Sequence, residues 1–149
     1  MSGPEQLPVT VWNAAVGDPL PELVVVTDPI SLFRFSATTW NAHRIHWDHL
    51  YSLTEGYEGL VVQSHLHGSY LARMVRQWAG PAGRLNRFSW QNRRYAVVGD
   101  VLTCTGRVVG VTRDNDMLTI DLELAEHNQR GELCAPGTAT VTVPADGHM

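Results

Sequence analysis

The sequence contains 149 residues, of which 44% are hydrophobic and 17% are charged, and its formal net charge at pH 7 is -4. This length and composition fit one folded domain, residues 1–149, and argue against a disordered chain. The negative charge gives no basis for nucleic-acid binding, and no apolar run approaches the ~20 residues needed to cross a bilayer, so neither nucleic acid nor a membrane is an expected partner.

The first 21 residues carry four prolines and little periodicity, which indicates an N-terminal arm (residues 1–21) that lies over the fold, with Trp12 as an anchor. They lack the basic start and the apolar stretch of a secretory signal, so we expect a cytoplasmic protein. Residues 22–39 are β-branched and aromatic but interrupted at Pro29, which predicts two short extended segments. Residues 47–56 (WDHLYSLTEG) predict one or two helical turns that end at a glycine.

Residues 60–81 (LVVQSHLHGSYLARMVRQWAGP) predict one long helix. Apolar residues recur there at intervals of one, three or four, which gives a single apolar stripe. Ser64 is the expected N-cap, because its hydroxyl can accept a hydrogen bond from a backbone amide of the first turn. Gly80 and Pro81 end the helix. The stripe consists of Leu66, Tyr70, Leu71, Met74, Val75 and Trp78.

Strand-like segments, separated by turns rich in Gly, Asp and Asn, follow the helix almost to the end of the chain. They cover residues 84–98, 100–114, 117–128 and 132–143. Cys104 and Cys134 form no CxxC pair and are interpreted as small buried strand residues. A helix cannot leave its apolar stripe in water, and an antiparallel sheet needs a cover for its apolar face. We therefore predict an α+β hot-dog fold, in which an antiparallel sheet wraps around one long central helix.

Three histidines stand three residues apart in WNAHRIHWDH, residues 40–49. His43 and His46 could share one face of a helix, but His49 lies a further turn along, and no cysteine or HExxH pattern accompanies them, so we expect no metal site. Acid–base chemistry is the other functional interpretation, with His46 as a proton carrier at cellular pH and Asn41 as its neighbour. A structural alternative stays open, in which Asn41 caps a short helix and His46 is partly buried and hydrogen-bonded.

The stretch FRFSATTWNAHRIHWD, residues 33–48, resembles the signature of MaoC-like hydratases and dehydratases, which have the hot-dog fold. The similarity continues in order through EGYEGLVV, NRRYAVVGDVL and GELCAPGTATV and covers most of residues 30–143. It is closest to the branch that includes 3-hydroxyacyl thioester dehydratases and mesaconyl-CoA hydratases. The resemblance therefore implies the same fold as the pattern of helix and strands.

In the more familiar branch of that family the motif reads like D-x-N-P-x-H, with an Asp–His pair that handles the water. His46 falls on the histidine and Asn41 on the aspartate. A carboxylate can take a proton from water, whereas an amide can only orient the water molecule. The resemblance thus implies that His46 is the general base or acid and that Asn41 is its water-orienting partner.

The resemblance also implies a role for the start of the long helix. In the family a VVHGP-like stretch presents a backbone amide to the thioester carbonyl, where enolate charge develops. Here the stretch reads VVQSHLHG, so backbone N–H groups from Ser64 to Leu66 would polarise the carbonyl. For His65 and His67 a place in the pocket and a place facing solvent both stay open. The residues expected to bind substrate are His43, Gln63, Ser64, His65 and Leu66.

The resulting hypothesis is an enoyl thioester hydratase or 3-hydroxyacyl thioester dehydratase, which adds water reversibly to a 2-enoyl thioester. The substrate would be carried on coenzyme A or on an acyl carrier protein, and the reaction needs no cofactor. The family implies a homodimer or a heterodimer with a second hot-dog chain. Two alternatives remain: a hot-dog acyl-CoA thioesterase, although the helix start lacks the acidic residue this would use, and a non-catalytic hot-dog subunit that completes a partner's active site.

Overall fold

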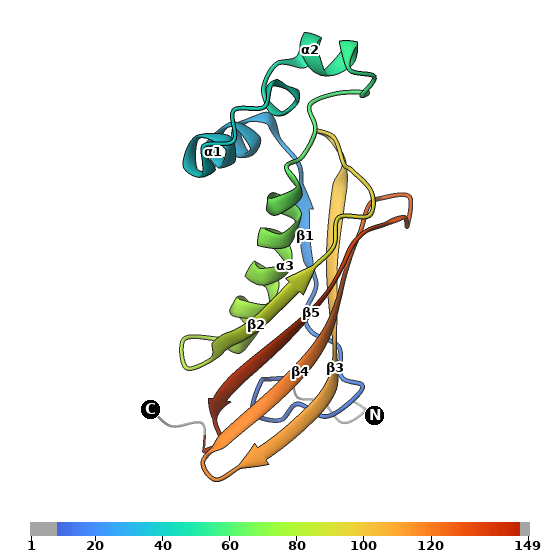
Figure 1. Ribbon diagram of the computed structural model, residues 1–149. Helices are drawn as coiled ribbons and strands as arrows, with labels where there is room; N and C mark the ends of the chain where they lie inside the picture. Colours follow the sequence, from blue (N-terminus) through green and yellow to red (C-terminus); the bar gives the residue numbers. More distant parts are fainter. Residues whose placement is uncertain (1–8, 147–149) are drawn as a thin grey trace, which may run out of the picture.

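The computed structural model describes residues 9–146 and contains one five-stranded antiparallel sheet with the long helix α3 along one face (Figure 1). The strand order is β1-β3-β4-β5-β2, which is the predicted α+β hot-dog arrangement. Within the described part, none of the helices has the length and hydrophobicity of a membrane span. The elements are β1 (Leu23–Val26), α1 (Pro29–Thr39), the 3-10 turn η1 (Arg44–His46), α2 (His49–Thr54), α3 (Ser64–Ala79), β2 (Arg84–Trp90), β3 (Val101–Asp114), β4 (Met117–His127) and β5 (Leu133–Pro144).

The core lies between α3 and the sheet, and β4 shows best how the sequence builds it. Buried and outward-facing residues alternate along this strand, because successive side chains of a strand point to opposite faces. Cys104 and Cys134 are free, and both are buried, as predicted. Burial raises the pKa of the Cys104 thiol far above its usual range, so this residue acts as a small core side chain. The buried β4 and α3 residues include Leu118, Ile120, Leu122, Leu124, Leu71, Met74 and Val75.

Helix α3 approaches the edge strand β2 closely at Gly68. A Cβ atom at this position would lie 2.7 Å from Cε2 of Trp90, which is closer than real Cβ contacts come. Glycine normally weakens a helix, so its presence here is explained by the indole ring that occupies the space of a side chain.

Gly68→Ala is expected to lower the free energy of unfolding. Overpacking against Trp90 costs about 1–3 kcal/mol, which exceeds the ~1 kcal/mol that alanine gains over glycine in a helix. The measurement is urea unfolding, with Ser69→Ala as the matched control on the exposed neighbour. A Gly68→Ala protein as stable as the unmodified chain would contradict the close packing.

The prediction of two extended segments in residues 22–39 is correct for β1 but wrong for the second segment, which is helix α1. A helix start was encoded there: the Asp28 carboxylate accepts the Ser31 N–H at 2.9 Å, and Pro29 occupies the first helical turn. The proline lacks an N–H that would have no partner at this position, and its fixed φ suits a helix. The β-branched and aromatic composition was therefore outweighed by local capping.

The predicted strand over residues 84–98 is also shorter than expected, because β2 ends at Trp90. Beyond it, the Gln91 N–H donates to the Pro136 carbonyl at 3.0 Å and the Arg93 N–H to the Cys134 carbonyl at 2.8 Å. The chain then leaves the sheet and crosses to the segment that precedes α3. The other predicted elements are confirmed: α2 is a short helix, α3 ends before Gly80, and β3, β4 and β5 are long strands.

The described part of the predicted arm is residues 9–21, of which residues 17–20 lie along β3; residues 1–8 fall outside the described residues. Backbone hydrogen bonds join the two segments, including Gly17 N–H to Val108 O at 2.8 Å and Leu20 N–H to Gly106 O at 2.9 Å. The Trp12 Nε1–H donates to the Pro144 carbonyl at 3.0 Å. The arm therefore continues the sheet beyond β1 along the same strand.

Two ionisable side chains, one on α3 and one on β4, lie in the core. His67 of α3 and Glu126 of β4 are fully buried and hydrogen-bonded through Nδ1 and Oε1. The Cys104 thiol donates to the other carboxylate oxygen at 3.9 Å, and Nε2 of His67 has no partner among the described residues. The solvent-facing alternative for His67 is thus wrong, because its ring is fully buried and points inward from the first turns of α3.

Candidate active site

His46 is held at the end of the 3-10 turn η1, and its side chain is buried, with a relative exposure of 7%. Its Nδ1 lies 2.6 Å from the backbone carbonyl oxygen of Val61. Since a carbonyl only accepts, Nδ1 must carry the proton, and Nε2 of the neutral ring then has a lone pair. No hydrogen-bond partner for Nε2 occurs among residues 9–146, so this nitrogen is available as a base.

The surroundings of His46 favour this neutral form. Burial lowers the pKa of His46 below its ordinary value of 6.5, the hydrogen bond to Val61 acts in the opposite direction, and the nearby ring of His43 lowers the pKa further. Burial disfavours the charged imidazolium, because the protein interior solvates charge less well than water. At neutral pH the ring can therefore accept a proton.

The segment that carries the Val61 carbonyl is fixed from two sides. On one side, the Val61 N–H donates to the Ile45 carbonyl at 2.9 Å, so Val61 contacts η1 through both of its backbone polar groups. On the other side, the Val62 N–H donates to Ala96 O and the Val98 N–H to Leu60 O, both at 2.9 Å. The position of the imidazole thus depends on the chain that leaves β2.

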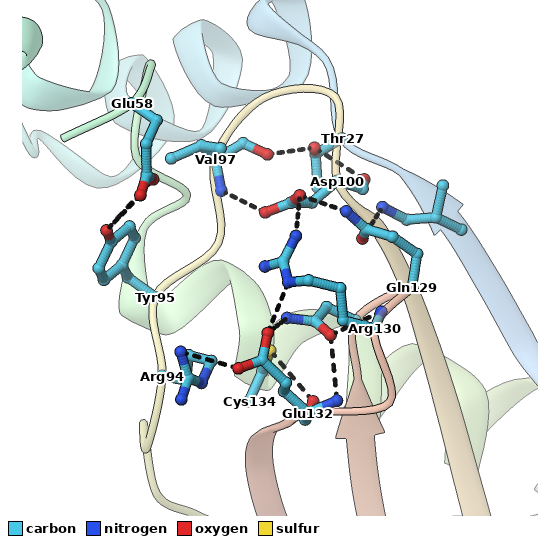
Figure 2. A network of polar contacts seen from close by, with 12 residues as sticks. Thr27, Glu58, Arg94, Tyr95, Val97, Asp100, Gln129, Arg130, Glu132 and Cys134 are labelled. Atoms are coloured by element: carbon cyan, nitrogen blue, oxygen red, sulfur yellow. Dashed lines mark hydrogen bonds and ion pairs between the residues drawn. The ribbon is translucent and has the colours of Figure 1, made fainter.

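Figure 2 shows the polar network that holds this chain just before β3, and Asp100 lies at its centre. The Asp100 carboxylate accepts the Val97 N–H at 2.9 Å and the Gln129 side-chain amide at 2.7 Å. The Thr27 hydroxyl donates to the Val97 carbonyl at 2.8 Å. These contacts join the end of β1, the start of β3 and the β4–β5 loop behind the candidate site.

Ion pairs extend the same network outward (Figure 2). The Glu132 carboxylate forms ion pairs with Arg130 at 2.6 Å and with Arg94 at 2.9 Å. Nearby, the Tyr95 hydroxyl donates a hydrogen bond to the Glu58 carboxylate at 3.2 Å. Such exposed pairs contribute about 0–1 kcal/mol each. These contacts therefore add little to the stability of the whole fold.

Asn41 follows the C-terminal end of α1. Its backbone N–H donates to the Ser36 carbonyl at 3.0 Å, and its side-chain Oδ1 accepts the His43 N–H at 3.3 Å. The side chain is partly exposed, and the second lone pair of Oδ1 and the amide N–H groups stay available to a water molecule. His43 itself is exposed, and its ring packs edge to face against that of His46 at 5.9 Å.

Gln63, and not Ser64, is the N-cap of α3, which corrects the prediction for this helix start. The Gln63 side chain is buried and makes no capping bond; its Nε2 donates to the Leu32 carbonyl at 2.7 Å and to the Ser36 hydroxyl at 2.8 Å. It therefore ties α3 to α1. Its Oε1 is buried without a hydrogen-bond partner among the described residues.

The first turn of α3 presents backbone amides. The Leu66 N–H already donates to the Gln63 carbonyl at 3.0 Å, so it is not available. Those of Ser64 and His65 have no acceptor in the described chain, as expected for the first residues of a helix. Leu66 is buried, whereas His65 is exposed and its ring contacts Trp90 at 5.4 Å between centroids. The helix dipole adds partial positive charge at the same place.

Ser36 and Val61 are the two residues of the site that sequence reasoning missed. Ser36 accepts from Gln63 through its hydroxyl and from Asn41 through its carbonyl, and so joins the helix start to the water-orienting candidate. Val61 acts only through its backbone, which no side-chain pattern reveals. Through these contacts Asn41 is linked to Gln63 at the start of α3, and His46 to Val61, three residues before Ser64.

Comparison with known proteins gives a match over residues 18–98 to the family model described as hydroxyacyl-thioester dehydratase type 2, which covers more than half of the chain. Mesaconyl-C(4)-CoA hydratase from Chloroflexus aurantiacus is 55% identical over 53 residues. This match covers 35% of the chain and 19% of that hydratase, so it relates the chain to about a fifth of the longer protein.

Solved structures confirm the fold. R-hydratase PhaJ1 from Pseudomonas aeruginosa is 20% identical, with a TM-score of 0.82 over 89% of this chain and 83% of that one. A chain of the ChsH1-ChsH2 complex from Mycobacterium tuberculosis is 22% identical, with a TM-score of 0.77 over 87% of this chain and 98% of that one. Likenesses at this identity show the hot-dog fold alone.

Proposed function

This chain belongs to the hydroxyacyl-thioester dehydratase type 2 family, and from that membership we propose that it catalyses the reversible addition of water to a 2-enoyl thioester. The observation that carries the proposal is the buried His46, whose Nδ1–H is held by the Val61 carbonyl three residues before α3 begins. A neutral imidazole beside the amide end of a helix suits a reaction that moves one proton and develops one negative charge.

In the proposed mechanism, Nε2 of His46 removes a proton from a water molecule that Asn41 orients. The water oxygen forms a bond to C3 of the substrate as the C2–C3 double bond opens, and negative charge moves to the thioester oxygen. The N–H groups of Ser64 and His65 and the dipole of α3 stabilise this enolate. The imidazolium then returns the proton to C2, so that one water has been added and His46 is neutral again.

The other expected site residues have supporting roles in this proposal. Gln63 contributes by fixing α1 on the helix start, since its amide faces Leu32 and Ser36. The exposed ring of His43 packs edge to face against the ring of His46 and lowers its pKa. We further propose that the thioester is carried on coenzyme A or an acyl carrier protein, and that the chain pairs with itself or with a second hot-dog chain.

The direct test is hydration of crotonyl-CoA by the purified chain, followed as loss of the conjugated thioester and as appearance of the 3-hydroxyacyl product. Release of free thiol without hydration would favour the thioesterase alternative, although the first turn of α3 has no acidic residue. If the chain alone gave neither product but supported hydration when mixed with a second hot-dog subunit lacking its own histidine, the proposal would still hold. No activity in either assay, with a folded protein, would leave the non-catalytic alternative.

The pH dependence of hydration is expected to follow His46. Hydration requires the neutral ring, so kcat/KM should be constant at neutral pH and should fall only as the pH drops through the lowered pKa of His46, below 6.5. In His43→Ala the fall should move to higher pH, because one cause of the lowered pKa is removed. Initial rates between pH 4.5 and 8 give both profiles, and a fall above pH 7 would contradict this environment.

A further inference from the structure

A groove of about 480 Å³ lies between the C-terminal half of α1 and the turn that leads to η1. Three of its seven lining residues are aromatic and exposed: Trp40 at 92%, Phe33 at 64% and Trp47 at 47%. Single apolar side chains on a surface need no explanation, but several around one hollow mark a binding surface. The volume is that of a small-molecule site.

The lining of this groove contains no charged residue. Besides the aromatic rings it consists of Ala37, Ala42, Ser36 and Asn41. A carboxylate placed among these groups would lose hydration without gaining a cation in exchange, which is costly. The groove therefore suits a hydrocarbon ligand and disfavours an anionic one.

Two polar residues of the groove lining connect it with the proposed reaction site. Asn41 is the water-orienting candidate, and the Ser36 hydroxyl accepts from Gln63 at the start of α3. In a 2-enoyl thioester the carbonyl carbon is C1 and water adds at C3. With C1 at the helix start and C3 beside Asn41, the remaining carbons continue past Asn41, toward the aromatic lining.

We infer, on the basis of the proposed function, that this groove binds the acyl chain from C4 outward and that the substrates are thioesters with long or bulky hydrocarbon acyl groups. Trp40 is the left-handed C-cap of α1, and its indole, 92% exposed, lines the groove. Contact with the acyl chain would bury that ring. The mesaconyl group named for the relative from Chloroflexus aurantiacus is small and acidic, so the substrate class of this chain differs.

Chain-length selectivity tests the inference. With the full-length chain, kcat/KM should be at least about tenfold higher for trans-2-decenoyl-CoA than for crotonyl-CoA, since each buried CH₂ contributes about fourfold. Ala37→Phe, which fills the groove, should lower this ratio by about tenfold or more. Thr38→Phe adds the same ring to the next, exposed residue of α1 outside the lining and should leave the ratio unchanged. Equal kcat/KM values for both substrates would overturn the inference.

Binding without chemistry separates this inference from the proposed function. Isothermal titration with saturated decanoyl-CoA and butanoyl-CoA should give a clear preference for the decanoyl thioester, which Ala37→Phe removes. Trp40→Ala provides a second variant, with a weakened preference, if Ala37→Phe does not fold. A decanoyl preference in a chain that supports no hydration, either alone or with a second hot-dog subunit, would support the groove and refute the reaction. Equal affinities for the two thioesters, or no binding of either, would overturn the inference. Variants that change the sedimentation coefficient but not the binding preference would also overturn it, because they would show that a second copy of the chain covers the groove.

Discussion

His46→Ala is expected to lower kcat/KM for hydration of a 2-enoyl thioester by about 10²–10⁴-fold, the range typical for loss of a general acid or base. The proton acceptor in the proposed mechanism is Nε2, which has no hydrogen-bond partner among residues 9–146, whereas the Nδ1–H donates to the Val61 carbonyl. Without the ring, water near C3 has no proton acceptor, because the Asn41 amide cannot take a full proton. Initial hydration rates of the two purified proteins give the factor.

His49→Ala is the matched control for this variant, because His49 is an exposed histidine three residues away at the first position of α2. It should retain the rate of the unmodified protein. Thermal unfolding of both variants shows whether the loss of the bond to Val61 also loosens the fold. A folded His46→Ala protein with near-normal turnover would refute the proposed base.

The second large effect concerns stability and the buried pair of His67 and Glu126. Glu126→Ala should lower the free energy of unfolding by about 3–5 kcal/mol, the typical cost of removing one member of a buried polar pair. Both side chains are fully buried, so water cannot replace the lost carboxylate at the His67 ring. Chemical denaturation measures the difference, and a loss below about 1 kcal/mol would contradict the burial of this pair.

Two further variants separate the pair from its surroundings. Replacing both members, as His67→Leu with Glu126→Met, should recover most of the loss, because a well-packed apolar pair avoids the desolvation of two polar groups. Glu123→Ala changes an exposed glutamate on the same strand, whose carboxylate lies 3.7 Å from Arg107, and should cost less than about 1 kcal/mol. A double variant as unstable as Glu126→Ala would assign the loss to packing volume.

Much of the fold follows from patterns that are local in the sequence. The apolar stripe of α3 and the alternation of β4 express the two side-chain periodicities, and these require no knowledge of distant residues. The same reasoning failed for α1, where composition suggested a strand and the Asp28-Pro29 start produced a helix. It failed for His67, because a polar residue at an inward position gives no sign of a buried partner 59 residues away.

In the candidate site, too, some features follow from the sequence and others only from the structure. The sequence by itself determined which side chains have the chemistry, a histidine at position 46 and an amide at position 41, and the likeness of residues 33–48 to a known motif suggested the reaction class. Only the tertiary structure decided that Val61 sets the tautomer of His46, that Gln63 fastens α1 to the start of α3, and that aromatic rings line a groove beside Asn41. Chemical type is a property of single residues, whereas a tautomer or a groove depends on atoms brought together from separate segments by packing.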